Sequence, residues 1–109
     1  MKYQHKIQAK GEWQKKSLAE QMANIGSEIE RSIKWLNKNK KHSELAFYRA
    51  IELFNLSICD PKNKKRLKEI IRAQEIFSDD YLNNKLDQKN KKSWQNYFMG
   101  FNYLVCKNK

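Results

Sequence analysis

The chain has 109 residues, of which 39% are hydrophobic and 32% charged, a balance typical of one folded domain rather than a disordered segment. Three glycines and one proline are too few for the turns of an all-β domain, so we expect an all-α fold. The net charge of +11 at pH 7 favours a polyanion or an acidic protein as partner, or it is a solvated surface that an AT-rich, lysine-favouring coding sequence produces.

The N-terminal residues 1–12 are polar and basic. We expect them to form a flexible or partner-dependent arm that precedes a single domain over residues 13–109. The first helix is predicted to begin at Ser17, because Ser17 and Glu20 have the spacing of a capping box, and to end near Asn37. Its apolar positions recur at spacings of three and four and are Leu18, Met22, Ile25, Ile29, Ile33 and Leu36.

The second predicted helix runs from about Ser43 to Cys59 and is apolar on two sides. One stripe contains Phe47, Ile51, Phe54 and Ile58, and the other contains Leu45, Leu53 and Leu56. A helix that is apolar on two sides contacts two neighbouring helices or an outside partner.

Asp60-Pro61 marks the next boundary, since Asp favours the N-cap position and Pro the first helical position. The third helix is predicted to run from Pro61 to about Leu82, and Ser93 is predicted to cap a fourth. The inward residues of the third are Leu67, Ile70, Ile71, Phe77 and Tyr81; those of the fourth are Trp94, Tyr97 or Phe98, Phe101, and Leu104 or Val105. Four helices joined by short loops predict an up-down-up-down four-helix bundle.

A glycine and a row of polar residues flank the apolar stripe of the first helix. Gly26 weakens the helix by about 1 kcal/mol, and we expect it to allow a neighbouring helix to approach closely. The polar row contains Gln21, Asn24, Glu28 and Arg31. Three interpretations of this row stay open: a solvated flank, a semi-buried polar network, or a groove that faces a partner.

Gln74 falls within the apolar stripe of the third helix and therefore needs a buried hydrogen-bond partner. We expect that partner to be Arg49 or Glu52 of the second helix.

Basic residues crowd the opening turns of the third helix, namely Lys62, Lys64, Lys65, Arg66 and Lys68. Free amides at a helix N-terminus and nearby cations together favour an anion, so this segment is either an anion-binding site or a set of solvated side chains. In the predicted bundle both ends are basic, with the other end carrying Lys38, Lys40, Lys41, Lys85, Lys89, Lys91 and Lys92.

Catalytic and cofactor chemistry finds little support in the sequence. Cys59 and Cys106 lie in apolar stretches and are predicted to be buried free thiols in a reducing cytoplasm, without the spacing of a metal site. The histidines, His5 and His42, form no nucleophile-base pair. No apolar run approaches the roughly 18 residues of a membrane span. We expect a cytoplasmic, non-enzymatic protein with no cofactor, no metal, no membrane contact and no small-molecule substrate.

Three stretches resemble a family of small uncharacterised bacterial four-helix proteins: SLAEQMANIGSEIERSIKW, AFYRAIELFNLSICDPKNKKRLKEIIRAQEIFSDDYL and the tryptophan-containing last helix. The resemblance covers the chain from about Trp13 onward, with departures at Asn55-Leu56-Ser57 and at Ala73-Gln74. It implies a bundle distantly similar to HEPN domains, which are often paired with a nucleotidyltransferase in two-gene systems.

Active HEPN ribonucleases carry an Arg and a His a few residues apart. Here Arg31 and His42 are eleven residues apart, so the resemblance implies a non-catalytic member. The function predicted from the sequence is that of an interaction protein, either a homodimer or the partner subunit of a two-gene, toxin-antitoxin-like system. The alternative is an RNA-binding or RNA-processing protein that acts through its basic ends.

Overall fold

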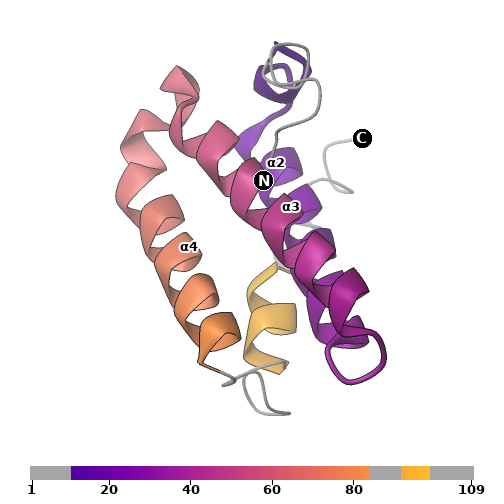
Figure 1. The fold of residues 1–109 in the computed structure, drawn as a ribbon. Helices are drawn as coiled ribbons and strands as arrows, with labels where there is room; N and C mark the ends of the chain where they lie inside the picture. The colour runs from indigo at the N-terminus through magenta and orange to yellow at the C-terminus, as the bar shows by residue number, and fades with distance from the viewer. Residues whose placement is uncertain (1–10, 84–91, 99–109) are drawn as a thin grey trace.

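The computed structural model describes residues 11–83 and 92–98 (Figure 1). The helices in these residues are α2 (Leu18–Trp35), α3 (Lys40–Ile58), the 3₁₀ helix η1 (Pro61–Arg66) and α4 (Leu67–Leu82). Two shorter helices cover residues 11–14 and 92–98. The described residues contain no strand, which confirms the predicted all-α fold.

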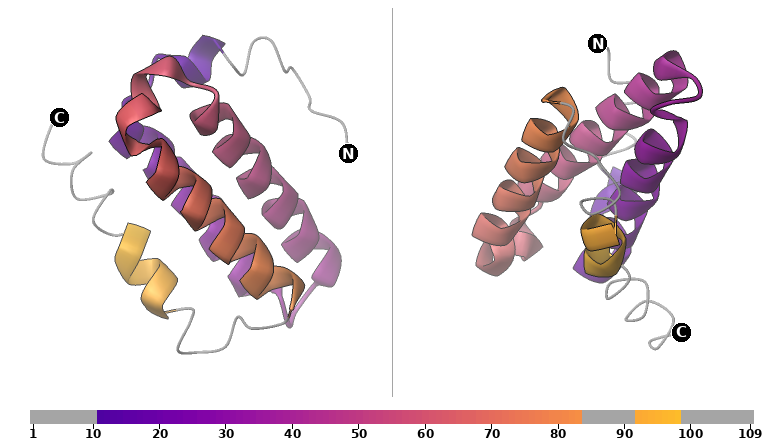
Figure 2. Two further views of the ribbon diagram at one scale, coloured as in Figure 1. Left: turned by 90° about the vertical axis from the view of Figure 1, so that its left-hand side faces the viewer. Right: turned by 90° about the horizontal axis from the view of Figure 1, so that it is seen from below.

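Contacts between the helices establish their directions (Figure 2). Ser43 near the start of α3 donates to the carbonyl of Ser32 near the end of α2, so these two helices are antiparallel. The ring of Phe47 stacks on that of Tyr81 at 4.2 Å, so the start of α3 meets the end of α4. The short helix 92–98 runs antiparallel to α4, because its Trp94 and Tyr97 bond to Asp80 and Glu69 respectively. The up-down-up-down order is therefore confirmed within the described residues.

The predicted start of α2 is confirmed by its cap. The Ser17 hydroxyl accepts the Glu20 amide at 3.2 Å, and the Glu20 carboxylate accepts the Ser17 amide at 3.1 Å. This reciprocal pair satisfies two amides that have no partner within the helix. The helix ends at Trp35, two residues before the predicted Asn37.

The predicted start of α3 is wrong by three residues. The helix begins at Lys40 because the side chain of Asn39 accepts the amide of His42 and supplies the N-cap. Ser43, which was predicted to begin the helix, lies one turn inside it and is fully buried.

The third predicted helix is two elements rather than one. Residues Pro61–Arg66 form η1, and the α-helix begins only at Leu67. Arg66, at φ −111° and ψ 11°, departs from helical geometry and separates the two. The tighter 3₁₀ turn places Asn63 in the interior, where its amide forms the hydrogen bonds described below. The end of α4 at Leu82 agrees with the prediction.

The core lies between α2, α3, α4 and the short helix 92–98. Among residues 11–83 and 92–98 it is built from thirteen buried side chains, Trp13, Met22, Ile25, Ile29, Ile33, Phe47, Ala50, Phe54, Ile70, Ala73, Phe77, Trp94 and Phe98. Phe54 and Phe77 are fully buried. Partly buried residues packed against it include Leu53 and Leu56 of the second apolar stripe of α3, whereas Leu45 of that stripe is exposed.

Several sequence predictions concern the ends of these elements. Cys59 is exposed rather than buried, and it is the C-cap residue of α3, just beyond the last residue of that helix. Ser93 lies inside the short helix 92–98 and not at the position before it. Gly11 and Glu12, predicted as part of the arm, belong to the helix 11–14. The predictions for residues 1–10, Phe101, Leu104, Val105 and Cys106 lie outside the described residues.

The close approach predicted for Gly26 is confirmed. A methyl group added there would lie 2.6 Å from Cγ, 2.7 Å from Cβ and 2.8 Å from Cδ1 of Phe98. Cβ of Phe98 is attached to the backbone of the short helix 92–98, so that helix packs on α2 at a distance that only glycine permits.

Candidate functional surfaces

A buried polar cluster joins the N-terminal segment to α2, the end of α3 and η1. The Gln21 amide donates to Asp60 Oδ2 at 2.8 Å and to the Trp13 carbonyl at 2.9 Å, and its oxygen accepts from Asn63 at 2.8 Å. Asn63 also donates to the Ser57 carbonyl at 3.0 Å, and the Trp13 indole donates to the Ser57 hydroxyl at 2.9 Å. Gln21, Ser57, Asp60 and Asn63 are all buried. The cluster therefore ties four segments together rather than facing a ligand.

Asp60 carries the charge of this cluster. Burial by itself would raise its pKa, but hydrogen bonds from the Lys62 side chain, from Gln21 and from the Lys62 amide outweigh burial and hold the pKa below its ordinary value. The Lys62 ammonium also forms an ion pair with this carboxylate. The carboxylate is thus held in its charged form inside the fold.

A second polar group lies along the seam between α2 and α3. Glu28 is buried and pairs with Arg31 on its own helix and with Arg49 of α3, whose Nε lies 3.5 Å from Glu28 Oε2. Asn24, by contrast, is exposed and donates to the carbonyl of Glu20. The polar row of α2 is thus a mixture: Gln21 and Glu28 are structural, and Asn24 is solvated.

The predicted partner of Gln74 is wrong. Its amide donates to Asn55 of α3 at 2.8 Å, whereas Arg49 turns toward Glu28. Glu52 is half-buried, and this burial raises the pKa of its carboxyl despite the opposing effect of Arg49. The partner of Gln74 does come from α3, as predicted, but it is Asn55, about one turn beyond Glu52.

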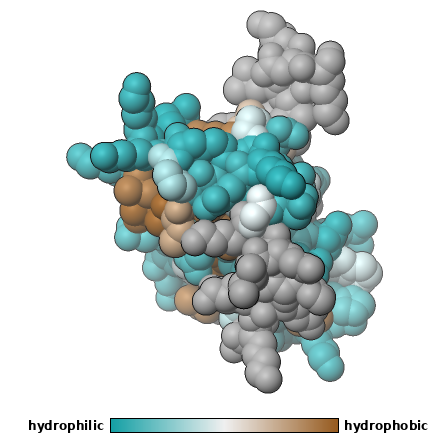
Figure 3. Space-filling view, turned by 90° about the horizontal axis from the view of Figure 1, so that it is seen from above, coloured by the Kyte–Doolittle hydropathy of each residue, from teal (hydrophilic) through white to brown (hydrophobic). Residues whose placement is uncertain are grey.

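The basic residues of η1 lie at one end of the bundle together with the N-terminal segment. The Lys62 ammonium donates to the Gln14 carbonyl at 3.1 Å, which places Lys15 and Lys16 beside η1. Hydrophilic side chains cover much of the described surface of this end (Figure 3). Lys64, Lys65 and Lys68 are exposed, as are Lys15 and Lys62.

The amide that begins η1 is already bonded. The Lys62 amide donates to Asp60 Oδ1 at 3.1 Å, so it is not free to bind an anion. Arg66 is paired with Glu69, whose Oε2 lies 2.6 Å from the guanidinium. An anion at this end would therefore be held by lysine side chains, and such binding stays a prediction.

Four large apolar side chains are exposed on α3 and α4, and three of them lie close in sequence to the stacked pair of Phe47 and Tyr81. Leu45, Tyr48 and Leu82 are 57%, 46% and 69% exposed. Tyr48 and Leu82 directly follow Phe47 and Tyr81, whose rings stack. We call these three residues the apolar end cluster. The fourth exposed residue, Ile76, lies elsewhere on α4, facing the short helix 92–98.

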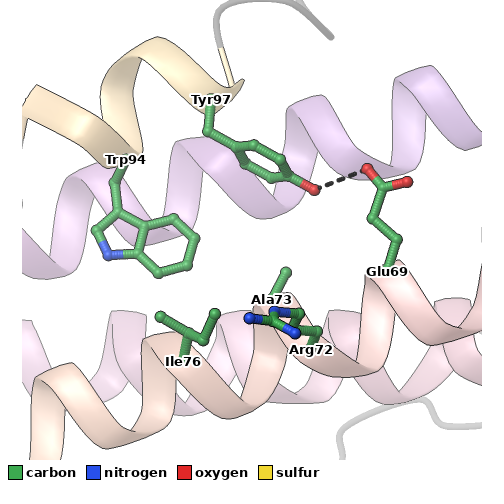
Figure 4. Close-up of a pocket in the computed structure, with 6 residues that line it drawn as sticks. All are labelled: Glu69, Arg72, Ala73, Ile76, Trp94 and Tyr97. Atoms are coloured by element: carbon green, nitrogen blue, oxygen red, sulfur yellow. Dashed lines mark hydrogen bonds between the residues drawn. The ribbon is translucent and has the colours of Figure 1, made fainter.

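A groove of about 230 Å³ separates α4 from the short helix 92–98, and it is lined by Glu69, Arg72, Ala73, Ile76, Trp94 and Tyr97. Trp94 and Tyr97 face Ile76 and Ala73 across it, and Glu69 closes one end (Figure 4). A second hollow continues along the seam to Asp80 and Ser93. Three residues line both the groove and this hollow, namely Ile76, Trp94 and Tyr97.

Tyr97 is the most strongly perturbed group of the groove. Burial of its hydroxyl, the charge of Glu69 and a hydrogen bond to Glu69 Oε1 at 3.1 Å raise its pKa to about 12. It is therefore a neutral hydrogen-bond donor over the physiological pH range.

Neither a metal-binding group nor a membrane-spanning helix occurs in the described part of the chain. Within residues 11–83 and 92–98, no three His, Cys, Asp or Glu side chains are grouped so that they could hold a metal ion. None of the helices in this part of the chain combines the length and the apolar character that a membrane crossing requires.

Sequence reasoning missed three members of the buried polar cluster. In the sequence, Trp13 marks only the start of the domain, Ser57 is only a position in a motif, and Asn63 is only a polar residue within a basic segment. The one usable sign was Asp60-Pro61 followed by a polar residue two positions later, which the 3₁₀ turn brings inside.

No family model, curated protein or solved structure matches the chain, so the resemblance to HEPN-like bundles stays a prediction.

Proposed function

We propose that the protein is a non-enzymatic helical bundle that binds an acidic protein through its apolar end cluster. The observation that carries this proposal is the exposure of Leu45, Tyr48 and Leu82 near the point where Phe47 of α3 stacks on Tyr81 of α4. Single exposed apolar residues are common on folded proteins, whereas a group of them is typical of an interface.

Two members of the cluster, Leu45 and Leu82, belong neither to the buried core nor to the side chains packed against it. The third, Tyr48, lies one turn from Leu45 on α3, and its ring meets that of the core residue Phe47 edge-on at 5.5 Å. Burying these side chains against a partner is favourable by about 25 cal/mol for each Å² of apolar surface. The cluster is therefore best explained by a partner that covers it.

The charge of the chain favours an acidic partner over a second copy. A net charge of +11 makes two copies repel each other, and it accelerates association with a negatively charged protein. Lys40 and Lys41, in the first turn of α3, are exposed beside the cluster and suit an acidic rim on the partner. The implied two-gene arrangement makes the product of a neighbouring gene the first partner to test.

The experiment is a purification of the tagged protein from its native host, with bound proteins identified by mass spectrometry. Wild type should retain one acidic protein in stoichiometric amount, and Leu45→Gln with Leu82→Gln should lose it. Ile76→Gln is the matched control, because Ile76 is also exposed on α4 but lies away from the cluster. Equal retention by all variants, or a wild-type dimer in light scattering, would contradict the proposal.

Binding of a polyanion such as RNA is a second candidate function, and one contact favours it. The bond from Lys62 to the Gln14 carbonyl gathers the lysines of residues 11–17 and of η1 at one end. RNA affinity should fall steeply with salt, and Lys64→Glu with Lys65→Glu should weaken it and flatten its salt dependence. The same pair of changes at Lys40 and Lys41, at the opposite basic end, should weaken RNA binding less if the lysines gathered by Lys62 hold the RNA.

A further inference from the structure

The groove between α4 and the short helix 92–98 combines apolar walls with one uncompensated charge. Its walls are Trp94 and Tyr97 on one side and Ala73 and Ile76 on the other (Figure 4). Ile76 is 43% exposed, although it faces two aromatic residues across the seam. A large apolar side chain left open opposite aromatic rings suits the insertion of another apolar group.

The charges around the groove leave one cation without a counterion. Glu69 is neutralised by Arg66, which approaches its Oε2 at 2.6 Å, and its other oxygen accepts the Tyr97 hydroxyl. Arg72 lines the same groove and forms no ion pair within the described part of the chain. The lining of the groove is almost wholly apolar, so a ligand would meet the guanidinium of Arg72, an exposed residue, only where a polar arm reaches the rim.

The remaining carboxylate of the seam lies further off. Asp80 accepts from the Trp94 indole at 3.2 Å. It is two turns of α4 beyond Arg72, about 12 Å at the rise of an α-helix. A small anion placed at Arg72 is therefore separated from Asp80 by Ile76.

We infer that this groove binds a small aromatic monoanion, with its ring between Trp94 and Ile76 and its carboxylate on Arg72. A volume of about 230 Å³ is below the range of about 300–1,000 Å³ for drug-sized ligands, so a single ring with a short acidic arm is the fitting size. Arginine binds a carboxylate through two parallel hydrogen bonds, which orients such a ligand. The lining of this site includes no residue of the apolar end cluster and none of the basic residues of η1.

The test is a titration of the full-length, ¹⁵N-labelled protein with phenylacetate, followed through the indole resonance of Trp94, which Trp94→Phe assigns. Phenylacetate should shift this resonance with saturation, and the uncharged phenylacetamide should bind more weakly. Arg72→Gln should reduce phenylacetate affinity about fivefold, as expected for an exposed charge pair, and leave phenylacetamide unaffected.

Lys68→Gln is the matched control, since it removes one positive charge from the same helix at an exposed position outside the groove. It should leave the affinity for phenylacetate unchanged. Equal binding of the acid and the amide, equal effects of the two substitutions, or no shift of the Trp94 indole would each overturn the inference.

Discussion

Replacing Gly26 by alanine tests the packing of the short helix 92–98 on α2. The new methyl group would lie 2.6–2.8 Å from three atoms of Phe98, well inside van der Waals contact. The Phe98 ring can rotate away, but its Cβ, at 2.7 Å, moves only with the backbone. The substitution therefore pushes the short helix away from α2.

Two effects of opposite sign determine the magnitude. Alanine stabilises a helix interior over glycine by about 1 kcal/mol. Overpacking of a close contact costs about 1–3 kcal/mol. The expected result is a net loss of about 1 kcal/mol in the free energy of unfolding, larger if the short helix detaches and exposes Trp94 and Phe98 at about 1.5–3 kcal/mol each.

Urea unfolding followed by circular dichroism measures this loss. Gly11→Ala is the control, because nothing lies within 4 Å of a methyl group added there. In a protein that already carries Phe98→Ala, Gly26→Ala should lower the free energy of unfolding by less than it does in wild type, because Cγ and Cδ1 of Phe98 are then absent. A Gly26→Ala protein that gains about 1 kcal/mol would refute the close approach and show an ordinary helix glycine.

Three further predictions concern the polar cluster and the exposed thiol. Gln21→Leu removes one hydrogen-bond partner from each of the buried residues Asp60 and Asn63 and should cost about 3 kcal/mol in urea unfolding, whereas Asn24→Ala, on the solvated flank, should change stability by less than about 0.5 kcal/mol. Because the native pKa of Asp60 lies below its ordinary value, its contribution is complete above that ordinary value and disappears as the pH falls through the native pKa. Stability measured below about pH 4 should therefore fall less steeply in Asp60→Asn than in wild type. Cys59 is exposed, so a thiol-reactive dye should label the native protein rapidly. Loss of this fast labelling in Cys59→Ser would confirm that Cys59 is the labelled site, and fast labelling that persists in Cys59→Ser would refute it.

Local features of the chain were predictable because their physics is local. The capping box of Ser17 and Glu20 acts within one helical turn, and so does the boundary at Asp60-Pro61. The three-to-four spacing of apolar residues depends only on helix geometry, and it correctly placed Gly26 beside the buried face of α2. These signals determined the fold class and the order of the helices.

Tertiary structure decided which neighbour each of these faces meets. The Trp13 bond to Ser57 spans 44 residues and the Asn63 bond to Gln21 spans 42, so no local pattern could pair them. A buried amide requires a partner, but that requirement does not identify the partner, which is why Gln74 was assigned to Arg49 or Glu52 instead of Asn55. Periodicity determines the direction in which a side chain points, whereas hydrogen-bond partners, the groove at Arg72 and the exposure of Cys59 depend on where the other helices lie.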